Sequence, residues 1–310
     1  MRAVFQGKTI LGGTMKLEEI FANAPTVIDQ AQRQQYYEQG YLVFPSLIST
    51  EALVPLRVAA DRIVEKTREL TESSKEIDLE NNHTAKNPRL RRAAYLDDLD
   101  FEFWGICADS VIPDIAADLL GPNVRFREIM LNFKWAGGGA EVKWHQDLVF
   151  YPHTHSGTMQ FLLFLEDVAA EQGPLELYPG SHLGPIFEHY DERGEWTAAV
   201  RENDLASVGS DGPVAVTGPA GTVSVHHSRT IHGSRQNKSS QGRPVLVLTY
   251  SAADAIPYTA PAYPSSRYGV LVRGEEPGYA HHEELHVPMP PDWSDGYTSI
   301  FAHQEKETQA

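Results

Sequence analysis

The feature that most limits the fold of this chain is a series of short apolar stretches between residues 124 and 251, each bounded by turn residues. Near-alternation of apolar and polar residues over 124–135 predicts a strand with one covered face, and the continuous apolar run 158–165 predicts a strand buried on both faces. Several short strands joined by turns are typical of a β-sandwich or an open barrel. The other predicted strands cover 142–150, 173–178, 214–217, 221–226 and 244–251.

The part of the chain before residue 121 has helical composition instead. Asp29 is predicted to cap one helix and Gly40 to end it, just ahead of a short strand over 41–44. Ser49 or Thr50 is predicted to cap an amphipathic helix. Further helices are predicted over 16–24, 101–107 and 112–120.

These patterns predict one domain, with a mostly helical layer over 16–120 beside a β core over 124–251. The polar stretch 71–92 has no clear period and predicts an exposed loop that orders over a site. Residues 252–310 predict an irregular wrap with a frayed tail after Gln304. Residues 1–14 predict a loose extension, and Met15 is an alternative start.

Charge and cysteine content restrict the partners and the compartment. The formal net charge is -16 and the sequence pI is about 5.2, which argues against nucleic acid and anionic membranes as partners. Cys107 is the only cysteine, so no intramolecular disulfide can form. Neither a signal peptide nor a long apolar run stands out, and we expect a cytoplasmic protein.

The chemistry is concentrated in His145, Asp147 and His232. Residues i and i+2 of a strand point to the same face, so His145 and Asp147 can meet one metal ion. His232, followed by Gly233 and Ser234, is the candidate for a third ligand from a distant strand. Two imidazoles and one carboxylate form the facial triad of non-haem Fe(II) enzymes.

Arg243 stands at the start of a strand that reads as buried, directly before Pro244. A buried guanidinium needs an anionic partner, because an unpaired charge is costly away from water. A carboxylate suits the planar fork of arginine, which binds it bidentately. We therefore expect an anionic ligand beside the predicted metal site.

These motifs, with a Pro179-Gly180-Ser181-His182 turn and the pattern Tyr37-x-x-x-Gly40-Tyr41, resemble the phytanoyl-CoA dioxygenase family of Fe(II)- and 2-oxoglutarate-dependent oxygenases. The resemblance covers residues 36–248 and implies a double-stranded β-helix, or jelly roll, with flanking helices. It implies an oxidoreductase that uses Fe(II), 2-oxoglutarate and O2, with ascorbate as a stimulant, to hydroxylate a small molecule and release succinate and CO2.

The resemblance also implies roles for individual residues. His145, Asp147 and His232 become the iron ligands, Arg243 and Ser234 hold the distal carboxylate of 2-oxoglutarate, and Gln146 contacts cosubstrate or substrate. The carboxylate of Asp147 disfavours halogenation, because halogenating relatives have a small residue at this position. No separate acid or base is assigned beyond the iron centre itself.

The substrate is not identified by the sequence. The chain has no run of basic residues for the phosphates of CoA, which favours a free small molecule over an acyl-CoA. Candidate substrate contacts are Phe150, His153, His155 and Arg267. Two alternatives stay open, a cupin-type metalloenzyme independent of 2-oxoglutarate and a non-catalytic jelly-roll binding protein. The sequence does not indicate an oligomeric state.

Overall fold

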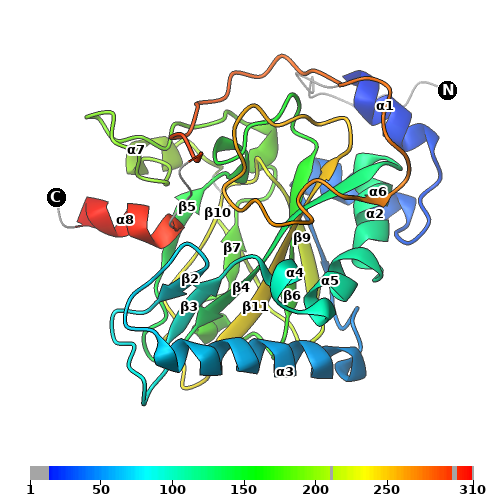
Figure 1. Ribbon diagram of the computed structural model, residues 1–310. Coiled ribbons are helices and arrows are strands. Elements are labelled where there is room, and N and C mark those ends of the chain that lie inside the picture. Colours follow the sequence, from blue (N-terminus) through cyan, green and yellow to red (C-terminus); the bar gives the residue numbers. More distant parts are fainter. Residues whose placement is uncertain (1–13, 210–211, 295–298, 309–310) are drawn as a thin grey trace.

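The computed structural model describes residues 14–209, 212–294 and 299–308 (Figure 1). The predicted N-terminal extension lies outside these residues except for its last position, Thr14, which begins the first helix. Within the described ranges, no helix is long and apolar enough to cross a membrane.

The predicted N-terminal helices are confirmed, and capping residues account for their ends. They are α1 (Thr14–Ala22), α2 (Gln30–Gln39) and α3 (Thr50–Lys66). Asp29 and Gln32 form a reciprocal capping box, with hydrogen bonds of 2.7 and 2.9 Å. Gly40 ends α2 at φ 82°, a conformation that costs glycine little, and leads into β1 (Tyr41–Phe44). Ser49 caps α3.

Two antiparallel sheets form the centre of the molecule. The larger has eight strands in the order β1-β9-β6-β11-β4-β3-β2, with β12 on β4, and the smaller has four in the order β5-β10-β7-β8. This confirms the predicted double-stranded β-helix with flanking helices. The strands are β2 (Ile77–Leu79), β3 (Leu90–Ala93), β4 (Val124–Lys134), β5 (Val142–His145), β6 (Thr158–Phe164), β7 (Leu175–Leu177), β8 (Val214–Val216), β9 (Val223–His227), β10 (His232–Ser234), β11 (Arg243–Ala252) and β12 (Leu271–Arg273).

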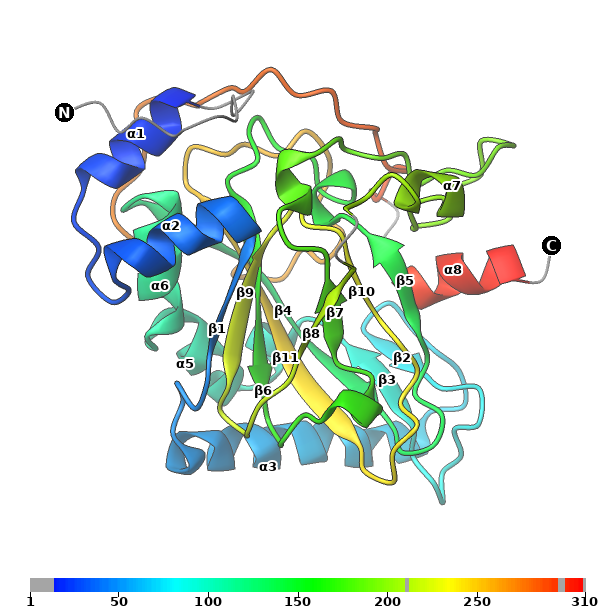
Figure 2. The same ribbon diagram turned by 180° about the vertical axis from the view of Figure 1, so that it is seen from behind.

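The larger sheet is covered on both faces, which gives the protein two apolar layers. Helices α3, α5 (Phe101–Ala108) and α6 (Ile112–Leu120) pack on one face, and α3 runs along the lower edge of the sheet in Figures 1 and 2. The smaller sheet faces the other side, where Leu162 and Val247 belong to the same apolar cluster as Leu177. Every residue of β6 is buried, as its continuous apolar run predicts.

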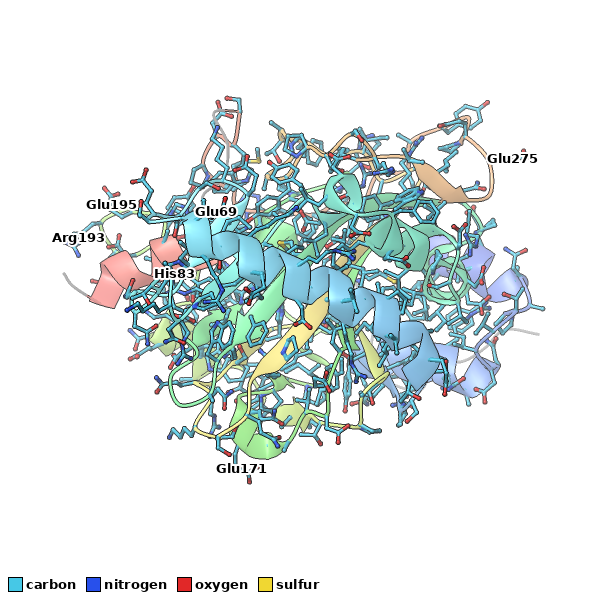
Figure 3. The ribbon with its side chains drawn as sticks, turned by 60° about the horizontal axis from the view of Figure 1, so that its bottom comes forward. Glu69, His83, Glu171, Arg193, Glu195 and Glu275 are labelled. Atoms are coloured by element: carbon cyan, nitrogen blue, oxygen red, sulfur yellow. The ribbon has the colours of Figure 1, made fainter. Side chains whose placement is uncertain are left out.

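The acidic excess lies on the outside of this framework. Figure 3 shows Glu69, Glu171, Glu195 and Glu275 at the periphery, and all four are exposed. These carboxylates stay hydrated, so they cost the fold little. The net charge therefore says nothing about the charge of an interior site.

The prediction of an exposed loop over 71–92 is confirmed for residues 71–76 and 84–87, which are exposed and irregular, but it was wrong for the two strands within this stretch. Strands β2 and β3 pair with each other, and β3 pairs with β4, so this stretch extends the larger sheet. All four residues of β3 are buried. The charges that suggested exposure have interior partners, since Arg91 pairs with Glu80 at 3.1 Å and Arg92 donates to the Tyr263 hydroxyl.

The C-terminal wrap is irregular over much of its length, as predicted, but it contains two elements that the sequence did not indicate. Strand β12 pairs with β4, and α8 (Ile300–Thr308) packs beside β5. Two short helices, α4 (Leu96–Leu99) and α7 (Glu202–Leu205), complete the described elements. Helix α8 continues beyond Gln304, where fraying was predicted.

Candidate metal centre

The three predicted ligands come together at one end of the smaller sheet. His145 ends β5 and His232 begins β10, and the two residues are partners in the antiparallel register. Their ring centroids are 4.1 Å apart. Asp147 is not on the strand, because β5 ends at His145 and the chain enters a 3-10 turn over Asp147–Val149. Gln146 between His145 and Asp147 keeps an extended backbone (φ -123°, ψ 126°), so the alternation of residues i and i+2 still brings this carboxylate to the imidazoles.

The facing atoms of the three side chains suit one metal ion. Asp147 Oδ1 lies 3.7 Å from His145 Nε2 and 3.6 Å from His232 Nε2, and the three ligand atoms all lie within 4.8 Å of one another. The other ring nitrogens donate to backbone carbonyls, His145 Nδ1 to Lys143 at 2.8 Å and His232 Nδ1 to Thr230 at 2.9 Å. These bonds fix the tautomer that leaves each Nε2 lone pair free for a metal.

The protonation states also suit metal binding. Burial lowers the pKa of both His145 and His232, although the charge of Asp147 opposes this shift. Burial alone would raise the pKa of Asp147, but His232, the hydrogen bond from His226 and the charge of His145 outweigh it and lower the value to about 2. The trio at neutral pH is thus two neutral imidazoles and a carboxylate, the forms that bind metals.

His226 supports the carboxylate from the larger sheet. Its Nε2 donates to Asp147 Oδ2 at 3.1 Å, which holds the carboxyl group with Oδ1 toward the two imidazoles. The neighbouring His227 points to the opposite face of β9 and lines a separate cavity. Adjacent strand residues thus have different surroundings, as their alternation predicts.

Substitution of His226 tests this supporting role. We expect His226→Ala to weaken Fe(II) binding by about 10–100-fold, because such partners of metal ligands fix orientation and basicity. Anaerobic Fe(II) titration measures the effect, with His227→Ala as the matched control that keeps wild-type affinity. Equal losses in the two variants would mean that general damage to β9, and not the bond to Asp147, causes the change.

A cavity of about 150 Å³ opens beside the ligands, between the two sheets. Arg243 projects into it from the first position of β11 and is 4% exposed. Its Nε has no hydrogen-bond partner among the described residues, and burial lowers its pKa to about 10. Ser234, at the end of β10, lines the same cavity. The cavity therefore holds a buried, charged guanidinium for which the described residues supply no anion.

Comparison with known proteins identifies the family. The model of the family "Phytanoyl-CoA dioxygenase (PhyH)" matches residues 36–245. The chain belongs to this family. It is 31% identical to a probable alpha-ketoglutarate-dependent hypophosphite dioxygenase of Stutzerimonas stutzeri, over 90% of this chain and 98% of that protein. It is 30% identical to L-proline trans-4-hydroxylase of Streptomyces griseoviridis, over 72% and 86% of the two chains.

Solved structures agree on the fold of this phytanoyl-CoA dioxygenase family member. The iron-bound structure of EctD from S. alaskensis superposes with a TM-score of 0.66 at 23% identity, covering 84% of this chain and 88% of that one. The carbocyclase SnoK superposes with a TM-score of 0.59 at 23% identity, covering 82% and 98%. Family and relatives together make the chain a 2-oxoglutarate-dependent dioxygenase that uses iron.

The predicted contact of Gln146 with cosubstrate or substrate is not what the structure has. Its side chain is fully buried away from the cavity, and both ends of the amide are in use. The NH2 group donates to the carbonyls of Arg229 at 2.8 Å and Pro185 at 3.2 Å, and Oε1 accepts from the Phe187 amide at 2.8 Å. Gln146 instead ties the metal-binding turn to two neighbouring loops.

Of the predicted substrate contacts, only Phe150 lines the cavity, where its ring packs edge-on against His145 at 5.6 Å. His153 and His155 are both buried, and neither lines this cavity. Arg267 lies outside it and pairs with Asp98 at 3.4 Å. The prediction of substrate contacts at these three residues therefore finds no support in the geometry.

Several residues that line the cavity were not predicted from the sequence. Strand β4 presents Glu128, Met130, Asn132 and Lys134 to the cavity, and Phe301 reaches it from α8. The two-residue spacing on β4 was a usable signal, because alternate residues share one face. What the sequence lacked was which of the two faces meets the metal ligands.

Proposed function

We propose that His145 Nε2, Asp147 Oδ1 and His232 Nε2 hold one Fe(II) ion. The observation that carries this proposal is the mutual approach of the three ligand atoms within 4.8 Å, with both imidazoles already oriented by backbone carbonyls. Three ligands on one side leave other coordination positions open, as an oxygenase requires. His226 keeps Asp147 in place from behind.

We further propose that Arg243 binds the distal carboxylate of 2-oxoglutarate, assisted by the hydroxyl group of Ser234. The guanidinium is buried, charged and without an anion in the cavity next to the metal ligands. A dicarboxylate would neutralise it through paired hydrogen bonds. Lys134, the strand partner of Arg243, is already engaged, because its Nζ donates to the backbone oxygens of Ser234 and Arg235.

When bound, Fe(II) and 2-oxoglutarate supply the oxidising chemistry, in which O2 is consumed, succinate and CO2 are released and a C–H bond becomes C–OH. The chain contributes orientation and exclusion of water. Val245, Val247 and Leu162 form an apolar wall of the cavity, and Phe150 covers His145. Ascorbate stimulates by keeping the iron ferrous.

The substrate, in this proposal, is a small free metabolite and not an acyl-CoA. The cavity is about 150 Å³ and enclosed by both sheets and the C-terminal wrap, which contributes Ala262, Tyr263 and Phe301. Among the relatives, one is named for hypophosphite and another for L-proline, both small molecules. A hydroxylation of such a molecule is the proposed reaction.

Succinate release tests the proposal. Purified protein is incubated with Fe(II), ascorbate, 2-oxoglutarate and a panel of small metabolites and acyl-CoA thioesters, with His145→Ala as control. We expect release that depends on 2-oxoglutarate and is stimulated by a small metabolite. Oxidation of a metabolite without 2-oxoglutarate would favour a cupin-type enzyme, and absence of Fe(II) binding would favour a binding protein.

A further inference from the structure

A row of polar side chains crosses the larger sheet from the metal centre to the far side of the cavity. His226 is the register partner of Gln160, Gln160 of Thr249, and Thr249 of Glu128. Cross-strand partners share one face, so these four side chains lie side by side on the inner face. His226, Gln160 and Glu128 line the cavity, and the row begins at the carboxylate of Asp147, to which His226 donates.

Glu128 ends this row with a carboxylate that has no ion pair among the described residues, although the charge of Arg92 acts on it from a distance. Oε1 accepts a hydrogen bond from the Thr249 hydroxyl at 3.2 Å, and no other hydrogen bond or ion pair joins Glu128 to a described residue. Burial raises the pKa of this carboxyl group to about 7. The hydrogen bond from Thr249 and the charge of Arg92 oppose the shift, and the charge of Asp147 adds to it. A carboxylate held in this way gains most from a ligand that donates to it.

The cosubstrate does not supply that donor. Arg243 pairs with Lys134 and Thr249 pairs with Glu128, so the two charges lie at the first and the seventh of the ten residue pairs of the β4 and β11 ladder. Six residues of strand separate Lys134 from Glu128, which is about 20 Å at the usual rise. A five-carbon keto acid anchored at Arg243 is shorter than this and carries no cation.

Arg92, a basic residue that also lines the cavity, does not donate to Glu128 either. Arg92 lies on β3 opposite Asn132 and donates from Nη1 to the Tyr263 hydroxyl. It also stands over the ring of Tyr263, 4.9 Å from the centroid. No ion pair joins this guanidinium to Glu128 in the described part of the chain, so the carboxylate faces the space left for the substrate.

We propose that Glu128 binds a cationic nitrogen of the substrate, so that the enzyme acts on a small amine or amidine and not on a simple oxyanion. This inference rests on the proposed function and narrows its substrate class. The positive group would sit at Glu128 and hold the rest of the molecule along the row toward the metal ligands. An anion such as hypophosphite would meet repulsion at this carboxylate.

Matched pairs of compounds test the proposal through 2-oxoglutarate consumption. The pairs are L-proline with cyclopentanecarboxylate, 4-aminobutyrate with butyrate, and cyclohexylamine with cyclohexanol, with hypophosphite as a separate probe. We expect stimulation by amine members and none by their partners or by hypophosphite. Stimulation by the nitrogen-free members or by hypophosphite, or no stimulation by any amine, overturns the proposal.

The variant Glu128→Gln keeps the size and the bond to Thr249 but removes the charge. We expect kcat/KM for a stimulating amine to fall about 10–100-fold, mostly through KM, as for the loss of a charged hydrogen bond. Glu176→Gln is the matched control, because Glu176 pairs with Arg235 and does not line the cavity. An unchanged KM for the amine in Glu128→Gln would overturn the assignment.

The slow consumption of 2-oxoglutarate without any substrate distinguishes a failure of the Glu128 proposal from a failure of the proposed function. If it depends on Fe(II) in the wild type, the proposed function stands and the compound pairs decide on Glu128 alone. If it is absent in the wild type and neither Fe(II) nor 2-oxoglutarate binds, the proposed function itself fails. Thermal unfolding of Glu128→Gln at the wild-type midpoint excludes misfolding as the cause of a loss.

Discussion

Replacement of His232 by alanine is expected to abolish both Fe(II) binding and 2-oxoglutarate consumption. The variant keeps His145 and Asp147, but two protein ligands should hold the ion far more weakly than the three that cluster here. The loss should exceed the roughly 10–100-fold effect of removing a supporting residue such as His226. Anaerobic Fe(II) titration and succinate release measure the two effects separately.

The matched control for His232→Ala is His155→Ala. His155 is equally buried, and it lines the other cavity, where its Nε2 lies 3.3 Å from Asp254. It should keep wild-type Fe(II) stoichiometry if folding is intact. Retention of one tightly bound Fe(II) per chain in His232→Ala would remove this residue from the metal site, whatever happens to activity.

Replacement of Arg243 by methionine is expected to separate stability from function. The buried guanidinium lacks a counter-ion, and its lowered pKa reflects the cost of burying its charge. An apolar side chain of similar length should leave the free energy of unfolding unchanged or raise it by up to about 3 kcal/mol. Binding of 2-oxoglutarate should weaken by about 2–5 kcal/mol, because its distal carboxylate loses a buried charged partner.

Thermal unfolding with and without 2-oxoglutarate measures both effects of Arg243→Met. In the wild type, a concentration one hundred times Kd should stabilise the metal-loaded protein by about 2.7 kcal/mol, and in the variant this gain should fall below about 1 kcal/mol. Arg235→Met is the control, since Arg235 is mostly exposed and pairs with Glu176 outside the cavity. A variant that is still stabilised as much as wild type would contradict the assignment of Arg243.

Short-range signals in the sequence predicted much of the fold. The capping box at Asp29, the left-handed Gly40 and the cap at Ser49 are short-range interactions, so a reader of the sequence can find them. The burial of β6 could be predicted from a local signal as well, because its apolar run is continuous. By contrast, β3 was missed because its arginines have partners inside the protein. Arg91 pairs with Glu80, and Arg92 donates to Tyr263, which lies far away in sequence.

The sequence predicted the site residues only where their residue types are rarely found together. The ligand trio and Arg243 stand out as chemistry, and the structure brings them to one cavity. Gln146 shows the limit of adjacency, because a neighbour of two ligands points away from them into a hydrogen-bonded support. Glu128 shows the converse, since the two-residue spacing on β4 groups it with Met130 on one face, but only the register with Thr249 and Gln160 shows that this face meets the cavity.

Anomalous diffraction at the iron edge, from crystals grown anaerobically with Fe(II) and 2-oxoglutarate, tests whether the three proposed ligands hold iron beside a keto acid bound to Arg243. We expect one iron peak per chain, about 2 Å from His145 Nε2, Asp147 Oδ1 and His232 Nε2. The far carboxylate of the keto acid should lie on Arg243. An iron peak elsewhere in the molecule, or a keto acid bound away from Arg243, would contradict these expectations.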